Sequence, residues 1–85
     1  MKEQEKQQTR DRIGLRIATL RKMQGMTITE LADKAGLDRG HVSRVEAGKY
    51  AVTLDVMENI AEALGMTVDI IDERLRDLAP LRVLT

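Results

Sequence analysis

The chain has 85 residues, with 14 Lys and Arg against 14 Asp and Glu, so its formal net charge at pH 7 is zero. It contains no cysteine, which excludes disulfides, thiolate metal sites and a cysteine nucleophile. Tyr50 is the only residue among Phe, Trp and Tyr, so we expect one domain with an aliphatic core. No apolar run is long enough to span a bilayer and no signal-peptide pattern opens the chain, so we expect a cytoplasmic protein with no membrane partner.

The charge is unevenly distributed along the chain. Residues 1–50 carry eleven Lys and Arg against seven Asp and Glu, a net charge of +4. Residues 51–85 carry three against seven, a net charge of −4. A local positive face can bind a polyanion even when the whole chain is neutral, so zero net charge does not exclude a nucleic-acid partner.

Residues 1–9 are polar and have no apolar face, so we expect a flexible arm or a frayed extension of the first helix. That helix is predicted to begin around Thr9 to Arg12, where apolar residues start to recur every three or four positions. Gly25 is a natural C-terminal stop for it.

Two short helices joined by a tight turn are predicted between Thr27 and Gly48. Thr27 is a good N-cap, and Glu30 stands three residues later, where its carboxylate can reach back to the Thr27 amide. Gly36 ends this helix, because the turn needs a positive φ. Asp38 then caps a second helix with Val42 and Val45 on its inward side. This spacing is typical of a helix-turn-helix.

The second helix of this unit presents polar residues outward. At 100° per residue, Gly40 and Arg44 lie opposite the inward side, flanked by Arg39, His41 and Ser43. Arginine pairs bidentately with guanine, and glycine lets the backbone approach a groove. A solvated helix face that happens to carry arginines is the simpler reading, but within this spacing nucleic-acid binding is favoured.

A third helix follows, with Thr53 as its N-cap and Gly65 as its stop. Its predicted inner stripe consists of Leu54, Met57, Ile60, Ala61 and Leu64. The acidic residues of its outer side are Asp55, Glu58 and Glu62. Residues 10–65 therefore form the predicted helix-turn-helix domain.

The tail, residues 66–85, changes character. Residues 66–71 (MTVDII) are β-branched and predict a strand or extended segment, residues 73–79 predict one or two helical turns before Pro80, and residues 81–85 predict a second short strand. An unpaired strand would expose an edge, so we favour a tail that pairs across a twofold axis and dimerises the protein. The alternative is that the tail packs on its own bundle.

The chain resembles the Cro and lambda-repressor type of helix-turn-helix protein, the XRE family. The resemblance is carried by IGLRIATLR, TITELADKAGLDRGHVSRVEAGK and TLDVMENIAEALG, between about Ile13 and Ile71. It implies an all-α, lambda-repressor-like bundle of four to five helices, here followed by a short extended or β C-terminal tail. It also implies binding to operator DNA, usually as a dimer.

Carried over position by position, the resemblance implies base-reading roles for Arg39, Gly40 and Arg44. The positions that it implies for phosphate contacts are Thr27, His41, Ser43, Lys49 and Tyr50. The chain departs from the family pattern at Ile28, where many members have a glutamine that touches a phosphate. It also lacks a proline near Val52 that is common after the recognition helix.

Arg21 and Glu46 are predicted to form a bidentate, partly buried ion pair. Each lies at the border of the buried stripe of its helix. The family has an Arg–Glu bridge at matching positions, which strengthens this prediction. The alternative is that both side chains point into water, where an ion pair would contribute little to the stability of the fold.

These features predict a sequence-specific, double-stranded-DNA-binding transcription regulator, most simply a homodimeric repressor of a palindromic operator that reads the major groove with residues 39–47. The alternative is an antitoxin, which binds a partner toxin and represses its own operon. No convergent carboxylate pair, phosphate loop or metal-ligand spacing is present, so an enzyme, a cofactor and a metal are not expected.

Overall fold

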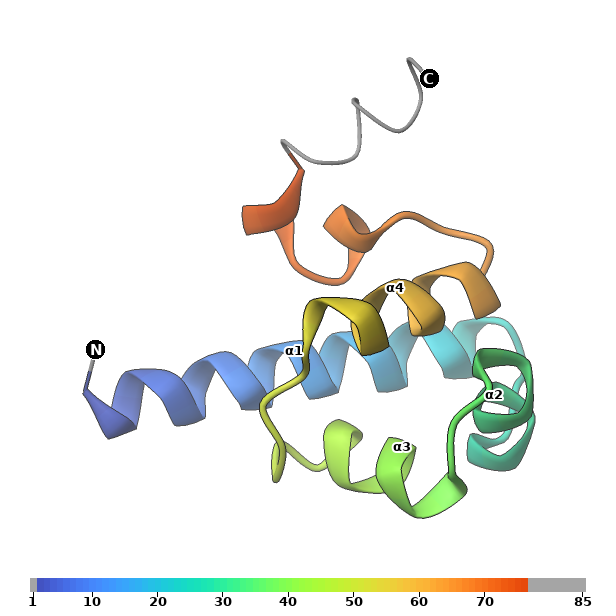
Figure 1. Cartoon of the computed structure of the whole chain (residues 1–85), viewed down its shortest axis with the longest axis horizontal. Coiled ribbons are helices and arrows are strands. Elements are labelled where there is room, and N and C mark those ends of the chain that lie inside the picture. The colour runs from blue at the N-terminus through green and yellow to red at the C-terminus, as the bar shows by residue number, and fades with distance from the viewer. Residues whose placement is uncertain (1, 77–85) are drawn as a thin grey trace.

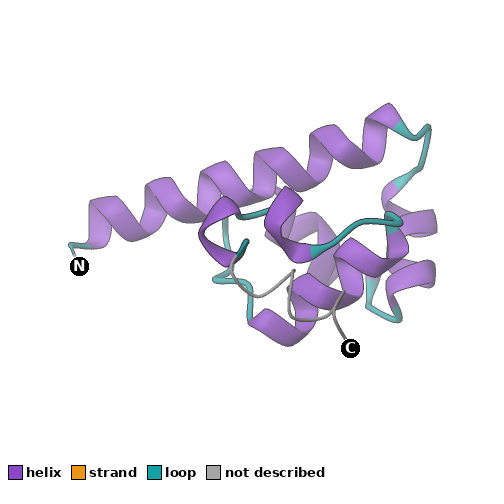
Figure 2. Ribbon diagram, turned by 90° about the horizontal axis from the view of Figure 1, so that it is seen from above, coloured by secondary structure: helices purple, strands orange, loops and turns teal. Residues whose placement is uncertain are grey.

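The computed structural model describes residues 2–76, and these residues form four α-helices and two short 3₁₀ turns (Figure 1). In chain order the elements are α1 (Glu3–Met23), α2 (Ile28–Ala35), α3 (Arg39–Glu46), α4 (Leu54–Ala63), η1 (Val68–Ile70) and η2 (Glu73–Leu75). The described part of the chain is all helical and contains no strand, as Figure 2 shows. The N-terminal turns of α1 project beyond the other helices in both views.

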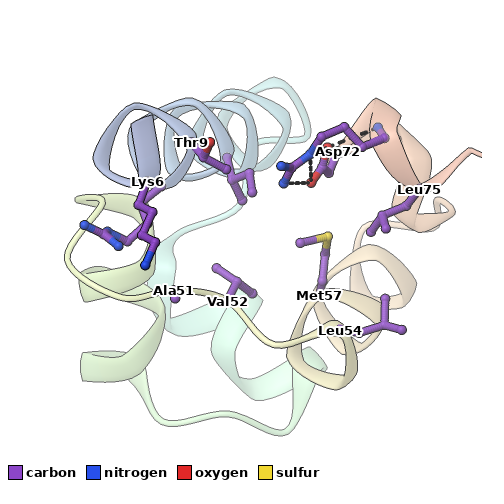
Figure 3. Close-up of a pocket in the computed structure, with 11 residues that line it drawn as sticks. Lys6, Thr9, Ala51, Val52, Leu54, Met57, Asp72 and Leu75 are labelled. Carbon is purple, nitrogen blue, oxygen red and sulfur yellow. Dashed lines mark hydrogen bonds and ion pairs between the residues drawn. The ribbon is translucent and has the colours of Figure 1, made fainter. Parts of the chain in front are cut away.

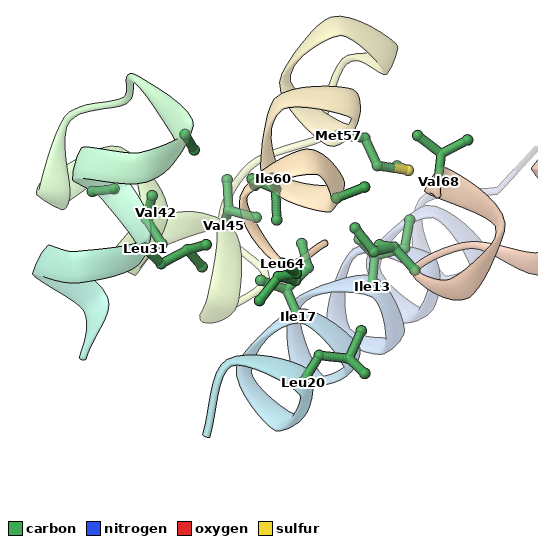
Figure 4. Close-up of a cluster of buried hydrophobic side chains, with 14 residues drawn as sticks. Ile13, Ile17, Leu20, Leu31, Val42, Val45, Met57, Ile60, Leu64 and Val68 are labelled. Carbon is green, nitrogen blue, oxygen red and sulfur yellow. The ribbon is translucent and has the colours of Figure 1, made fainter. Parts of the chain in front are cut away.

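One aliphatic core holds these elements together, and each of the four helices and the tail contributes to it (Figure 4). Its buried members are Ile13, Ile17, Leu20, Leu31, Ala32, Ala35, Val42, Val45, Met57, Ile60, Ala61, Leu64, Val68 and Ile71. The spacing of three and four residues in each helix turns these side chains to one face. Leu54 was expected on the inner stripe of α4, but it is 44% exposed because it stands in the first turn, at the edge of the bundle.

α1 begins at Glu3, six residues before the earliest start that the sequence predicted. Glu3 and Glu5 lie in the first turn, where negative charge favourably opposes the helix dipole. Arg10 donates a hydrogen bond to Glu3 at 2.9 Å, and Gln7 donates one to Asp11 at 2.8 Å. These polar contacts stabilise the first turns of α1, although this part of the helix has no apolar face to pack on the core. Of the two alternatives for this stretch, residues 3–9 therefore continue the first helix.

The strand predicted at residues 66–71 is wrong, because this stretch forms the 3₁₀ turn η1. Val68 and Ile71 are both 1% exposed and enter the same core. Residues three apart lie on one side of a 3₁₀ turn but on opposite faces of a strand, so burial of both requires the turn. The described part of the tail packs on its own bundle. The second strand predicted at residues 81–85 lies outside the described residues.

An acid that the sequence analysis did not single out fixes this tail. Asp72 is 2% exposed and accepts hydrogen bonds from the Arg74 guanidinium, the shortest at 2.6 Å. Arg12 of α1 lies 3.9 Å from the same carboxylate, and Arg16 donates to the Ile70 carbonyl at 2.9 Å. The hydrogen bonds from Arg74 hold the pKa of Asp72 below its usual range. The tail is thereby joined to α1.

Candidate nucleic-acid interface

The turn between α2 and α3 has the geometry that the sequence predicted. The Thr27 hydroxyl accepts from the Glu30 amide at 3.0 Å, and the Glu30 carboxylate accepts from the Thr27 amide at 2.9 Å. That amide hydrogen bond and the bond with the Thr27 hydroxyl lower the pKa of Glu30. Gly36 has φ +68°, and the Leu37 amide donates to the Ala32 carbonyl at 2.9 Å, which closes the end of α2. The turn that leads from α2 into α3 is therefore closed by contacts within a few residues.

α3 buries one side and exposes the other. Val42 and Val45 are 0% and 1% exposed, and Asp38 caps the helix by accepting from the Gly40 amide at 3.0 Å. The opposite side, which we call the outer face of α3, consists of Arg39, Gly40, His41, Ser43 and Arg44. Both arginines are exposed, and the other three residues are half-buried. The expected base-reading residues, Arg39, Gly40 and Arg44, thus share one accessible face.

Two contacts organise the long side chains of this face. Arg39 Nε donates to Thr29 Oγ1 of α2 at 3.2 Å, so its guanidinium lies against the start of the preceding helix. The Arg44 guanidinium carbon lies 5.1 Å from the centroid of the Tyr50 ring, a cation–π distance. Thr29 carries no signal in the sequence that would mark it for this role, because only the approach of α2 to α3 brings it to Arg39.

The loop after α3 places Lys49 and Tyr50 beside the outer face. Gly48 has φ +75°, and the Lys49 amide donates to the Arg44 carbonyl at 2.9 Å, so the chain turns back along the helix. Gln7 of α1 donates to the Gly48 carbonyl at 2.9 Å, which anchors the turn from the other side. The His41 and Tyr50 rings lie 5.2 Å apart. Of the expected phosphate contacts, His41, Ser43, Lys49 and Tyr50 therefore lie on α3 or directly after it.

Thr27 lies apart from that group, at the N-terminus of α2. It is exposed, and the N-termini of helices favour anions because their first amides lack partners within the helix. Ile28, at the position where the family resemblance implies a glutamine, is half-buried and packs against the core. At this position the protein therefore has an apolar side chain that packs on the core in place of a polar side chain that could contact a phosphate.

Helices α1 and α3 are joined by the ion pair predicted between Arg21 and Glu46. Arg21 Nε lies 2.7 Å from Glu46 Oε2 and Nη2 lies 3.0 Å from Oε1, a bidentate pair with both side chains over 90% buried. The pairing with Glu46 raises the pKa of Arg21. Arg21 also donates to the Met26 carbonyl at 2.8 Å, so the loop before α2 is fixed by the same side chain.

The crossing of these two helices also depends on Gly14, which the sequence analysis did not single out. A Cβ built on Gly14 would lie 2.5 Å from the Val45 carbonyl oxygen and 2.6 Å from that of Glu46. Only glycine permits this approach without a backbone shift. The angle of α3 is thus set by a glycine contact and an ion pair together.

A pocket of about 330 Å³ lies elsewhere in the fold, between the first half of α1, the loop before α4, the start of α4 and η2 (Figure 3). Its apolar walls include Ile13, Val52, Met57 and Leu75, and no residue of α2 or α3 lines it. It is therefore separate from the outer face of α3. Among residues 2–76 no cluster of three or more His, Cys, Asp or Glu could hold a metal ion. No helix in that range combines the length and apolarity needed to cross a bilayer.

Several known proteins are similar to this chain in sequence and in fold. The immunity repressor protein of Bacillus phage phi105 is 37% identical over 59 residues, which are 69% of this chain and 41% of the repressor. The chain therefore spans less than half the length of that relative. The restriction-modification controller protein C.AhdI of Aeromonas hydrophila is 32% identical, with a TM-score of 0.72 over 73% of this chain and 94% of that one. The clp gene regulator ClgR of C. glutamicum is 27% identical, with a TM-score of 0.71 over 74% and 82%.

The fold and the accessible outer face of α3 define a helix-turn-helix protein of the lambda-repressor-like class. The sequence profile of the helix-turn-helix family HTH_3 matches residues 17–71. The chain belongs to this family, whose members include DNA-binding regulators of transcription.

Proposed function

We propose that the protein is a sequence-specific repressor that binds a palindromic operator as a homodimer and reads the major groove with α3. The observation that carries this proposal is the outer face of α3, where two exposed arginines stand beside a half-buried glycine. Arg39 and Arg44 would contact base edges, and Gly40 would let the backbone come close. Thr27, His41, Ser43, Lys49 and Tyr50 would contact phosphates around them. The family and the phage repressor relative support this assignment.

A dimer fits this proposal because two copies of α3, one helical turn of DNA apart, would read two half-sites. The tail, residues 66–85, is our candidate for the contact between copies. Val68 and Ile71 are buried within one chain, so Ile70, 41% exposed, is the apolar side chain of the described tail most available to a partner, and Met66 and Leu75 are half-buried. Sedimentation equilibrium of the wild type and of Ile70→Ser tests this: the variant should dissociate at higher concentration. A monomeric wild type would exclude the dimer.

Selection of bound duplexes from a random pool tests the function itself. We expect enrichment of an approximate palindrome with half-site centres about 34 Å apart. Affinity for the enriched duplex should exceed that for a scrambled one by about 10³-fold or more at physiological salt. A protein that enriches no sequence and ignores DNA at low ionic strength would refute the proposal.

A protein partner such as a toxin is the second candidate, and the exposed acidic residues Asp55 and Glu62 on α4 support it. Both side chains are exposed, and neither forms an ion pair with a residue in the range 2–76. Co-expression with the neighbouring open reading frame and recovery of a stoichiometric complex would favour this function. The complex should weaken in an Asp55→Lys, Glu62→Lys variant.

A further inference from the structure

The Arg44 guanidinium lies close to two other residues, Gly40 on α3 and Tyr50 in the loop after it. A Cβ built on Gly40 would lie 3.1 Å from Arg44 Nη1 and 3.5 Å from Nη2, so the guanidinium lies over the backbone one turn earlier. The guanidinium carbon also lies over the Tyr50 ring, 5.1 Å from the centroid of that ring. Because glycine has no side chain, position 40 leaves the space that the Arg44 guanidinium occupies.

The Tyr50 ring is itself held in place. Its neighbour on α3 is His41, whose ring centroid lies 5.2 Å away at an interplanar angle of 48°. The backbone before it is fixed by the Lys49 amide, which donates to the Arg44 carbonyl at 2.9 Å, and by the left-handed turn at Gly48. Tyr50 is nevertheless 38% exposed, so the core does not explain its position. The only Tyr, Phe or Trp ring of the chain therefore stands beside an exposed arginine of the outer face.

We propose that Tyr50 is a positioning residue for base recognition: its ring holds the Arg44 guanidinium over Gly40 in the orientation that reads a guanine. The inference rests on the proposed function of α3. A ring stacked on one face of a guanidinium leaves the edge N–H groups free, and these are the donors of a bidentate contact with O6 and N7. An arginine ordered before binding loses less conformational freedom on the DNA. The ring therefore acts on sequence preference, whereas the Tyr50 hydroxyl would act on phosphate affinity.

Three variants separate these roles: Tyr50→Phe, Tyr50→Leu, and Tyr50→Leu combined with Arg44→Ala. Fluorescence anisotropy at one salt concentration gives the preference of each, the affinity for the selected duplex divided by that for a scrambled one. Tyr50→Phe should keep the wild-type preference, with both affinities lowered equally if the hydroxyl contacts a phosphate. Tyr50→Leu should lower the preference by about two- to fivefold, the range of an exposed cation–π contact. In the Arg44→Ala background the leucine should have no further effect on preference, because there is no guanidinium left to position.

A second measurement needs no DNA. The Arg44 side-chain resonances should show a ring-current shift in the wild type and in Tyr50→Phe, and should lose it in Tyr50→Leu. Thermal denaturation provides the folding control, since a half-exposed loop residue should change the midpoint little. An unchanged preference in folded Tyr50→Leu, or an equal loss in the Arg44→Ala background, would overturn the positioning role while leaving the proposed function intact. A wild type with no sequence preference would overturn both.

Discussion

Arg39 and Arg44 extend from the same face of α3 but are ordered by different neighbours. Arg39 is tied to Thr29 of α2 by a hydrogen bond of 3.2 Å, whereas Arg44 stands against a ring in the loop that follows α3. Arginine side chains can contact either a base or a phosphate, so exposure alone does not assign a role. A base contact makes the affinity for DNA depend on its sequence, whereas a phosphate contact raises the affinity for all sequences alike.

We expect Arg44→Ala to lose about 1–3 kcal/mol at the preferred site and to relax the preference there, because one bidentate base contact disappears. Anisotropy titrations with the selected and the scrambled duplex measure both effects. Lys34→Ala is the control: it removes one positive charge at the end of α2, where Lys34 is exposed beside Asn59 and Glu62 of α4, and it should leave the preference unchanged. Equal weakening of both duplexes by Arg44→Ala would assign Arg44 to a phosphate instead.

The Arg21–Glu46 ion pair should contribute to the stability of the fold. Arg21→Met should lower the free energy of unfolding by about 3 kcal/mol, because it leaves a carboxylate that is 8% exposed without its partner. The double variant Arg21→Met, Glu46→Leu should regain most of this loss, since no charge then remains buried. Urea denaturation measures all three proteins. A single variant as stable as the wild type would show that the pair contributes nothing to stability.

At the scale of elements, the orientation of α3 depends on its contact with α1. We expect Gly14→Ala to cost about 1–3 kcal/mol, because the new Cβ would meet two backbone carbonyl oxygens of α3 that cannot move without shifting the helix. Leu15→Ala, at a neighbouring position that is 68% exposed, should change stability little. Thermal denaturation gives the stability, and amide chemical shifts show whether α3 moves. Shifts confined to α1 would contradict the role of Gly14 in orienting α3.

The junction of the tail with α1 predicts a pH dependence. The depressed pKa of Asp72 means that its contribution is present above the unfolded pKa, about 3.9, and is lost as pH falls through the lower folded value. Asp72→Asn should therefore be less stable than the wild type at pH 7, by about 1–2 kcal/mol, with the difference shrinking toward about pH 2. Urea midpoints at several pH values measure it. A difference that does not change with pH would exclude the charge as its cause.

What the sequence predicts well is local. The caps at Thr27, Asp38 and Thr53 and the stop at Gly36 follow from residues within one turn of each other, and the structure has each of them. The start of α1 was predicted too late because polar contacts such as Arg10 with Glu3 leave no apolar period to detect. The 3₁₀ turn at Val68–Ile70 was missed because its short apolar run fits a strand equally well until the core that receives it is known.

Contacts between α3 and the other helices could not be predicted from the spacing of residues along the sequence. Thr29 meets Arg39 ten residues away, and Gly14 meets the end of α3 more than thirty residues away. The Arg21–Glu46 pair was an exception, since both residues border buried stripes whose mutual packing the helix-turn-helix already implies. Contacts between elements are predictable only where the pattern fixes how those elements pack.

At the scale of the whole molecule, charge separation decides how DNA would be approached. The chain is neutral overall, yet residues 1–50 carry a net charge of +4 and include α3 and both of its arginines. A neutral protein gains little long-range attraction to DNA, so its non-specific affinity should be modest and steeply dependent on the few cations at the contact. Each phosphate that such a cation neutralises releases counterions and adds about 0.9 to the slope of log affinity against log salt.

Lys49 allows this dependence to be tested. It is exposed directly after α3, at a position where we propose a phosphate contact. Lys49→Ala should lower affinity for selected and scrambled duplexes alike and flatten the salt slope by about one unit for each bound protomer, hence about two for a dimer. Lys34→Ala removes an equal charge beside α4, outside the proposed DNA contacts, and should leave the slope unchanged. Equal flattening by both variants would mean that affinity follows net charge, and an unchanged slope in Lys49→Ala would remove this lysine from the contact.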